Sequence, residues 1–404
     1  MEKKNVPKIR FPGFTEPWEQ RKIGECFKER KENMPEGELI SVTINEGIKK
    51  FSELGRHDNS NEDKSKYKKV CVGDIAYNSM RMWQGASGYS PYEGIVSPAY
   101  TILAPIEEVV DSKCISYLFK RQDMLRLFQV NSQGMTSDNW NLKFPILSEI
   151  NIMVSSNIKE QQKITTFFSM LDNLISLHHR KLENLKKQKK GLLQKMFPEK
   201  GKKVPEIRFP EFTNDWEQRK LEEYLIVSTE KNKDNTYDKG DVLSVSGDYG
   251  IVNQIEFQGR SFAGVFVSNY GVVHTGDIVY TKSPLKCNPY GIIKTNKGKV
   301  GIVSTLYAVY HPKKNIFSNF VQTYFELHTR MNNYMNPLVN KGAKNDMKVS
   351  SQNALKGNVI FPSYEEQKTI SEFFTNLDNL ISLHQRKLEH LQKQKKALLQ
   401  QMFV

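Results

Sequence analysis

Two stretches of the chain carry apolar residues at alternating spacings of three and four, with charged residues between them. Four heptads of this pattern predict two long helices whose apolar positions form a coiled-coil seam. The predicted seam residues are Phe168, Leu171, Ile175, Leu182, Leu185, Leu192 and Met196 in the first stretch and Phe374, Leu377, Ile381, Leu388, Leu391, Leu398 and Met402 in the second. The alternative is a pair of amphipathic helices that each pack on a globular core.

The same two signals precede both predicted helices. A short apolar stretch, residues 150–154 in the first case and 358–362 in the second, is typical of a strand that closes a domain. A polar residue then stands three positions before a glutamate, which is the spacing of a capping box. The two capping pairs are Asn157 with Glu160 and Ser363 with Glu366.

Large parts of the chain occur twice. Residues 7–22 read PKIRFPGFTEPWEQRK and residues 205–220 read PEIRFPEFTNDWEQRK, so that four of sixteen positions differ. Residues 171–197 and 377–403, within the predicted helices, differ at five of twenty-seven positions. An internal duplication therefore organises the whole chain.

The interiors of the two copies are dissimilar, apart from short echoes such as Gly73-Asp74-Ile75 and Gly276-Asp277-Ile278. A repeated frame with divergent interiors is expected when two equivalent domains act on two different targets; drift after duplication is the alternative. We predict recognition domains at residues 1–157 and 199–363 and spacer helices at residues 158–198 and 364–404.

The predicted fold class is α+β, with two pseudo-symmetric globular domains joined by two long antiparallel coiled-coil helices. Only residues 198–204 separate the first helix from the second domain, so the second helix has to run back and bring the C-terminus near the N-terminus. A helix over residues 168–196 spans about 44 Å, which is comparable to one DNA turn of about 34 Å. The domains would then meet DNA about a turn apart.

Four seam positions are polar, and they form two repeated pairs: His178 with His384, and Lys189 with Lys395. Polar residues in such seams commonly fix register and partner choice. A proton-linked switch at the histidines is the alternative that we do not favour.

Charge points to a polyanionic partner. The 404 residues include 59 Lys and Arg against 45 Asp and Glu, a net charge of +14, which makes nucleic acid the first partner to test. An acidic membrane surface is the alternative, but no apolar run approaches the roughly 20 residues that span a bilayer. The N-terminal segment has no apolar signal region, so we expect a cytoplasmic protein without a membrane partner.

Motifs for catalysis are missing. The sequence has no GxxxxGK[ST] loop, no HExxH and no CxxC pair, so a nucleotide site, a catalytic metal and a zinc site are not expected. The scattered Cys26, Cys71, Cys114 and Cys287 are read as free thiols. Asn288-Pro289-Tyr290 is a shortened form of the NPPY motif of adenine methyltransferases and lacks a cofactor loop. A stand-alone DNA-modifying enzyme and a coiled-coil scaffold stay as alternatives.

The repeated RFPGF…WEQRK frame, the Gly73-Asp74-Ile75 strand, the segment NSMRMWQGASGYS…GIVSPAY and the helix EQQKI…LDNLISLHHRKLENLKKQKKGLLQKMF together resemble the specificity subunit of type I restriction-modification systems. The resemblance covers essentially the whole chain. It implies a non-catalytic, DNA-binding subunit that reads a bipartite site in double-stranded DNA. It also implies two modification (methyltransferase) subunits and, optionally, two restriction (nuclease) subunits as partners. No cofactor is then bound by this chain; S-adenosylmethionine, ATP and Mg²⁺ are expected on the partners.

Side chains that read bases need paired donors and acceptors, whereas Lys and Arg on phosphates give affinity. In the first domain the polar loop after the Gly73-Asp74-Ile75 strand and a second loop near residue 135 are candidates, the first by its position in the family. The basic run at residues 64–69 could track phosphates, or it could simply be a solvated face. The candidate DNA-binding residues are Lys64, Lys66, Arg81, Trp83, Gln84, Ser87, Tyr89, Ser132, Gln133, Thr136 and Asn139.

The second domain has counterparts of both loops. One follows Gly276-Asp277-Ile278 and reads TKSPLKCNPYG, and the other reads KGAKND. Ordinary surface loops remain the alternative for both domains. The candidate residues here are Lys282, Ser283, Lys286, Asn288, Tyr290, Lys341, Lys344 and Asn345.

Overall fold

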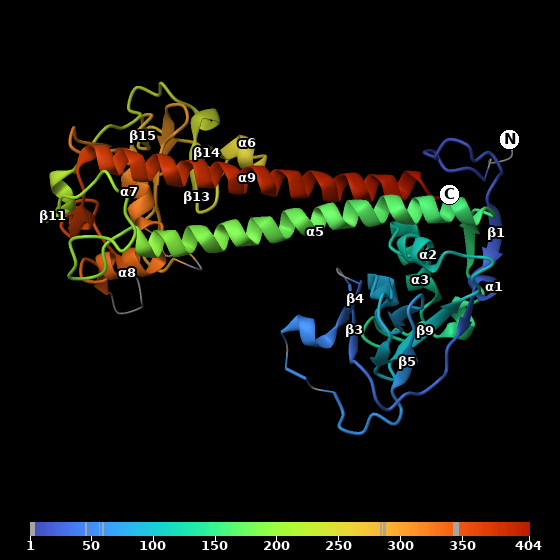
Figure 1. Cartoon of the computed structure of the whole chain (residues 1–404). Coiled ribbons are helices and arrows are strands. Elements are labelled where there is room, and N and C mark those ends of the chain that lie inside the picture. Colours follow the sequence, from blue (N-terminus) through green and yellow to red (C-terminus); the bar gives the residue numbers. More distant parts are fainter. Residues whose placement is uncertain are drawn as a thin grey trace. The chain divides into compact units, whose positions relative to one another are not determined.

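The computed structural model describes residues 5–44, 47–55, 57–58, 60–282, 285, 288–341 and 347–404. The chain forms two compact units, one made of Met1–His179 with Gln385–Val404 and the other of Arg180–His384. Each unit thus contains one globular domain, the first half of one long helix and the second half of the other (Figure 1).

The described residues of the first unit form sixteen short elements before its long helix. They are β1 (Glu19–Lys22), α1 (Ile23–Cys26), β2 (Phe27–Glu29), β3 (Ile40–Thr43), β4 (Gly47–Lys50), η1 (Phe51–Leu54), β5 (Lys68–Val70), β6 (Ile75–Asn78), η2 (Met82–Gln84), β7 (Ser87–Tyr89), β8 (Gly94–Val96), β9 (Tyr100–Pro105), α2 (Ser112–Leu118), α3 (Gln122–Asn131), α4 (Phe144–Leu147) and β10 (Asn151–Val154).

The second unit repeats much of this order. Its short elements are β11 (Glu217–Lys220), η3 (Leu221–Glu223), β12 (Leu225–Val227), η4 (Lys239–Asp241), β13 (Leu243–Ser246), β14 (Gly250–Asn253), α6 (Gln254–Gln258), β15 (Gly271–Val273), β16 (Ile278–Tyr280), β17 (Ile293–Thr295), β18 (Gly301–Val303), β19 (Ala308–Pro312), α7 (Ser318–Phe325), α8 (His328–Met335), β20 (Asn340–Lys341), β21 (Met347–Lys348), η5 (Asn353–Leu355) and β22 (Asn358–Phe361). The long helices are α5 (Ile158–Lys195) and α9 (Tyr364–Gln401).

A four-stranded antiparallel sheet lies at the centre of each domain. Its order is β2-β9-β6-β7 in the first unit and β12-β19-β16-β17 in the second. Successive residues of β6 point to opposite faces, as strand geometry requires: Ile75 and Tyr77 enter the large core that includes α2 and α3, whereas Ala76 enters a smaller cluster with β3, β4 and β8. The central strands that carry the candidate loops are therefore buried on both sides.

The repeated N-terminal frame holds the start of the long helix in its own domain. Arg10 donates two hydrogen bonds to the carboxylate of Glu160, at 2.6 and 2.9 Å, and Trp18 Nε1 donates to the same carboxylate at 3.1 Å. In the second unit Arg208 and Trp216 bind Glu366 in the same way. Both glutamates are fully buried, which explains why the frame and the helices are repeated together.

This contact corrects the predicted capping boxes. The side chain of Asn157 does accept a hydrogen bond from Lys159 N at 3.0 Å, and Ser363 Oγ accepts one from Glu366 N at 3.4 Å. The second hydrogen bond of a capping box, from the backbone N–H of the cap residue to the glutamate carboxylate, is absent among the described contacts. The arginine and tryptophan of the frame occupy the carboxylates of Glu160 and Glu366 instead.

Within each unit the two long helices run antiparallel, as predicted. In the first unit Phe168 stacks on Phe403, with ring centroids 6.2 Å apart, and Lys395 forms an ion pair with Asp172. In the second unit Lys189 Nζ lies 2.5 Å from Asp378 Oδ1. These lysines are two of the polar seam residues, and each is paired across the helices. His178 and His384 are half-buried.

All the predicted seam residues are buried or half-buried. The alternative of helices packed on a globular core also holds in part, because Phe168 and Leu171 belong to the core of the first domain as well. Near the ends of the helices, Leu193 and Leu399 are buried more deeply than the predicted Leu192 and Leu398, since they enter the domain cores.

Both ends of the chain belong to the first unit (Figure 1). Ile9 N donates to Gln401 O at 2.9 Å, and Trp18 packs edge-on against Phe403 with centroids 5.8 Å apart. The predicted proximity of the termini is therefore confirmed.

The described Cys26, Cys71 and Cys114 are free thiols, and Cys287 lies outside the described residues.

Candidate nucleic-acid interface

The first candidate loop connects β6 to β7 and has a compact, hydrogen-bonded shape. Arg81 N donates to Asn78 O at 3.0 Å, and Ala86 N donates back to Arg81 O at 3.1 Å. Gly85 ends the single 3₁₀ turn with a φ of 86°, a left-handed conformation that glycine adopts without steric cost. The turn leaves the side chains of Arg81 and Gln84 exposed.

The second candidate loop follows α3 and folds as a small hairpin. Gln133 and Asn141 exchange backbone hydrogen bonds of 3.0 and 2.8 Å, and Asn139 N donates to Thr136 O at 2.9 Å. The side chains of Gln133, Thr136 and Asn139 are exposed. Ser132 is half-buried, and its hydroxyl donates to Phe128 O at 2.7 Å, so it caps α3.

The two loops of the first domain lie side by side. The rings of Trp83 and Trp140 meet edge-on, with centroids 5.2 Å apart. Leu142 N also donates to Ser79 O at 2.8 Å, which joins the base of one loop to the base of the other. Exposed Arg81, Gln84 and the hairpin therefore form one polar surface, which we call the first reading surface.

Three predicted residues have internal positions instead. Ser87 is only 1% exposed, and its hydroxyl lacks a hydrogen-bond partner, so the prediction that it contacts DNA is wrong for this structure. The reason is its place on β7, where it pairs with Tyr77 of β6 and where the strand also packs against α2 and β4. Trp83 is half-buried and donates to Met80 O, and Tyr89 is half-buried beneath the Lys113 ammonium, 5.4 Å from its ring centroid.

The second domain places its first candidate loop against the end of α8. Tyr290 Oη donates to Asn336 Oδ1 at 2.8 Å, and Asn288 exchanges backbone hydrogen bonds with Leu285. Lys282 has a left-handed φ of 54° and its Nζ lies 3.4 Å from Thr305 O. Lys341 lies in β20, which pairs with β21 as a hairpin after α8. Ser283, Lys286, Lys344 and Asn345 lie outside the described residues.

The basic run contributes two candidate lysines and two internal ones. Lys66 is exposed and Lys64 is half-buried. In contrast, Lys68 Nζ donates to Tyr100 O at 2.7 Å, and Lys69 pairs with Glu32 at 3.1 Å. The phosphate-tracking prediction for Lys64 and Lys66 stays a prediction, and the rest of the run has structural partners.

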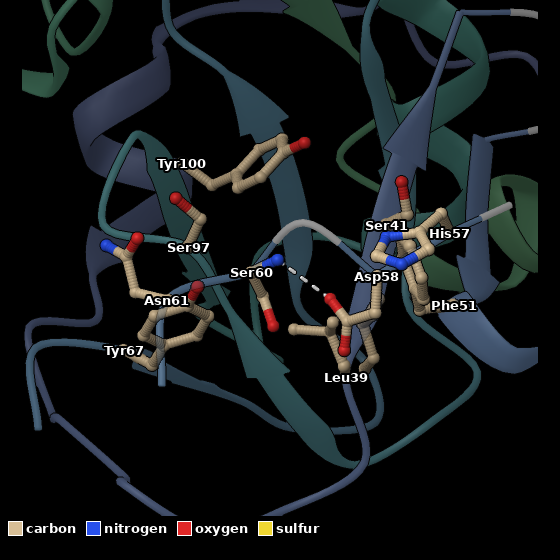
Figure 2. Close-up of a pocket in the computed structure, with 11 residues that line it drawn as sticks. Leu39, Ser41, Phe51, His57, Asp58, Ser60, Asn61, Tyr67, Ser97 and Tyr100 are labelled. Atoms are coloured by element: carbon tan, nitrogen blue, oxygen red, sulfur yellow. Dashed lines mark hydrogen bonds between the residues drawn. The ribbon is translucent and has the colours of Figure 1, made fainter. Parts of the chain in front are cut away.

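A cavity of about 500 Å³ lies beside the basic run in the first unit (Figure 2). Polar and aromatic groups line it, among them Ser41, Asn61, Tyr67 and Tyr100, and Ser60 N donates to Asp58 Oδ1 at 2.8 Å within it. Burial raises the pKa of the Tyr100 phenol. The described lining also includes His57 and Asp58 and contains no Lys or Arg.

The second unit also carries exposed aromatic residues that were not among the predicted site residues. Tyr249 and Phe257 pack against each other at 5.1 Å, and the Arg260 guanidinium lies over the Phe262 ring at 4.6 Å. Phe266 is 86% exposed. Exposed aromatic clusters are typical of interaction surfaces. These aromatic residues lie close together in the sequence, at residues 249–266. They have no repeated counterpart, so a search for loops shared by the two copies does not find them.

The described residues contain no cluster of His, Cys, Asp and Glu that could hold a metal ion. Across the same residues, no helix is both long enough and apolar enough to cross a membrane.

A family model described as a type I restriction modification DNA specificity domain matches the chain twice, over residues 15–187 and 190–393. The chain belongs to this family of specificity subunits. Two relatives from Methanocaldococcus jannaschii are the putative type I restriction enzyme MjaX specificity subunit, 23% identical, and the MjaVIII specificity subunit, 24% identical. Each comparison covers 98% of this chain, and 95% and 93% of the relatives.

Solved structures share the fold of this specificity subunit. The S subunit of the type I system from M. genitalium superposes with a TM-score of 0.59 at 15% identity, and 99% of each chain is covered. A second structure, described as addressing complex assembly and conformational transition of the type I R-M system, gives a TM-score of 0.51 at 13% identity, over 96% of this chain and 99% of that one. The resemblance in sequence is therefore confirmed as membership of the family, and the chain acts in recognition of a DNA target.

Proposed function

We propose that this specificity subunit reads a bipartite target in double-stranded DNA, one half with each globular domain. The observation that carries the proposal is the repeated frame: Arg10 with Glu160, and Arg208 with Glu366, fix two unlike domains to the long helices by the same contacts. Equivalent attachment with different loops suits two different half-sites. The helices would set the unread gap between them.

In the first domain we assign base contacts to the first reading surface, with Arg81 and Gln84 from one loop and Gln133, Thr136 and Asn139 from the other. These side chains are exposed and offer the donors and acceptors that base edges in the major groove require. In the second domain the loop around Asn288 and the hairpin that includes Lys341 are the counterparts. Lys64 and Lys66 supply phosphate contacts.

The exposed faces of the long helices are the proposed docking sites for two modification subunits. Leu174 and Leu177 of α5 are 38% and 50% exposed, and Leu380 and Leu383, their repeated counterparts on α9, are 47% and 56% exposed. Apolar side chains repeated at the same spacing on both helices suit a helical partner. Catalysis, with S-adenosylmethionine, ATP and Mg²⁺, is assigned to the modification and optional restriction subunits rather than to this chain.

The test is to map methylated adenines in DNA modified by this chain together with its modification subunit. We expect a two-part motif with a fixed gap, present only when this chain is added. Arg81→Ala should relax recognition in one half of the motif and leave the other half intact, because the domains read separately. Methylation of the same motif without this chain, or loss of both halves in a correctly folded Arg81→Ala variant, would contradict the proposal.

A further inference from the structure

A single lysine side chain binds three backbone carbonyls beneath the first reading surface. Lys120 follows α2, and its Nζ donates to Gly85 O at 2.5 Å, to Ser87 O at 2.8 Å and to Ile44 O at 3.3 Å. Gly85 and Ser87 lie at the end of the loop that carries Arg81 and Gln84. The hydrogen bonds of Lys120 therefore hold the C-terminal end of that loop.

The surroundings of Lys120 do not favour a positive charge. The ionisable group of α9 that faces it is Lys395, which has the same sign and is itself paired with Asp172 of α5. Burial, and then Lys395, lower the pKa of Lys120 to about 8. The amine of Lys120 is nonetheless held against three backbone carbonyls, which points to a role in the loop that it binds.

The internal repeat identifies the counterpart of Lys120. The contact of Asp111 N with Gln161 recurs 206 residues later as Phe317 N with Gln367, which relates position 120 to position 326. That position is Glu326, whose carboxylate pairs with Lys189 at 2.5 Å. Lys189 in turn is the counterpart of Lys395. The equivalent positions 120 and 326 therefore carry side chains of opposite charge in the two units.

The neighbouring strand differs in a matching way. Gly88 of β7 stands opposite Ala76, and the equivalent residue of β17, opposite Val279, is Lys294. A Cβ atom at position 88 would lie 3.0 Å from Gly47 Cα, so a side chain there would require the backbone at Gly47 to shift. Lys294 is buried and is one of the cations near Glu326. The lysine next to this position is therefore Lys294 of the strand in the second unit and Lys120, after α2, in the first.

We infer that Lys120 is a positioning residue that fixes the loop carrying Arg81 and Gln84 for reading the first half of the DNA target. The inference rests on the proposed function of that loop. Ala86 lies between Gly85 and Ser87, whose carbonyls Lys120 binds, and donates its N–H to Arg81 O. Holding this end of the loop therefore also fixes the backbone at Arg81.

The experiment compares Lys120→Met, Lys120→Glu and Lys120→Arg with wild type in the assembled methyltransferase. Methylation rates are measured on the cognate site and on sites with one base changed in either half. For Lys120→Met and Lys120→Glu we expect discrimination at the first half to fall about tenfold, the scale of one well-placed base contact, with discrimination at the second half unchanged. Lys120→Arg, which keeps the cation, should recover part of it.

Two further variants separate the possible failures. Glu326→Gln, at the counterpart position, should leave discrimination at the first half unchanged, and thermal unfolding verifies that each variant folds. If Arg81→Ala loses first-half discrimination and folded Lys120→Met does not, the positioning role is overturned while the proposed function of the loop stands. If Arg81→Ala also reads the first half normally, the loop is not a reading element and both proposals fail.

Discussion

Glu160 lies in the first turn of α5, and its buried carboxylate accepts hydrogen bonds from Arg10 and Trp18. It therefore joins three parts of the first unit. Replacing it by alanine leaves the guanidinium of Arg10 buried without its charge partner, and one nitrogen of that group already lacks a hydrogen-bond acceptor. We expect Glu160→Ala to lower the free energy of unfolding by about 3 kcal/mol. Urea unfolding of the full chain measures this loss.

A matched control is Glu149→Ala. Glu149 also pairs with a basic residue, Lys22 at 2.6 Å, but its side chain is 68% exposed. Exposed pairs contribute little, so the loss should stay below about 1 kcal/mol. Equal losses in the two variants would show that the buried contact does not hold the frame to the helix.

The amine of Lys120 gives the first unit a predictable dependence on pH. Its pKa is about 8 in the folded chain and 10.5 when unperturbed. Between these values the unfolded chain binds the proton and the folded chain does not, so the free energy of unfolding rises with pH in this window. Relative to Lys120→Met, the Tm of wild type should therefore rise between pH 8 and pH 10. Each kcal/mol gained in the free energy of unfolding corresponds to about 3 °C in Tm.

Thermal unfolding of both proteins across this pH range measures the difference. Because Lys120→Met removes the titrating amine and leaves Lys395 in place, the difference isolates one group. A constant difference in Tm across the range would mean that Lys120 titrates near its ordinary pKa.

Exposure of single residues was predictable from the sequence only where local structure decides it. Arg81 and Gln84 are exposed as expected, because they occupy a turn between two strands. Ser87 is buried because β7 begins at that residue, and the sequence gives no sign of where the loop ends and the strand starts. The contact between Trp83 and Trp140 depends on a distance of more than fifty residues along the chain, which no local pattern encodes.

At the scale of elements, the long helices were the most predictable feature. Their heptads repeat in register over both copies, and each predicted seam residue is at least half-buried. The greater burial of Leu193 and Leu399 was not predictable, because it comes from the domain that each helix end enters rather than from the other helix. The short strands of the divergent interiors carry too few residues for their pattern to fix their pairing.

The exposed leucines of α5 make a prediction at this scale. Leu174→Asp combined with Leu177→Asp should weaken binding of a modification subunit at least about tenfold, since both side chains are apolar and solvent-exposed in this chain alone. The Tm of the isolated chain should change little, because neither leucine belongs to a core cluster. Titration of the labelled chain with modification subunit measures the affinity.

Ser176→Asp provides the control for charge, because Ser176 is exposed and lies between the two leucines. It should leave the affinity nearly unchanged. Equal weakening by Ser176→Asp and by the double leucine variant would mean that charge, rather than loss of an apolar contact, disturbs the complex.

At the scale of the whole molecule, the duplication was readable because the frame and the helices are conserved between copies as one physical unit. The arginine and tryptophan of each frame hold the start of one helix, and the same tryptophan packs on the end of the other, Trp18 on Phe403 and Trp216 on Phe197. A change in one of these partners is constrained by the others. The described residues of the reading loops make no such contacts across the frame, so the loops are free to diverge, and their targets are not encoded in any repeated pattern.

The length of the two helices should set the gap between the half-sites. Inserting one heptad after Arg180 and one after Arg386 lengthens both helices by about 10 Å, which corresponds to about three base pairs. Insertion in both helices preserves the antiparallel register within each unit, including the pairs Asp172–Lys395 and Lys189–Asp378. We therefore expect methylation at a two-part motif with the same half-sites and a longer gap.

Insertion in α5 alone is the informative contrast. It forces the two helices to differ in length, so at least one of the two ion pairs and its neighbouring seam contacts has to break. We expect this variant to lose stability and modification, whereas the double insertion keeps both. An unchanged gap with the double insertion would mean that something other than helix length, such as the modification subunits or bending of the DNA, determines the spacing of the half-sites.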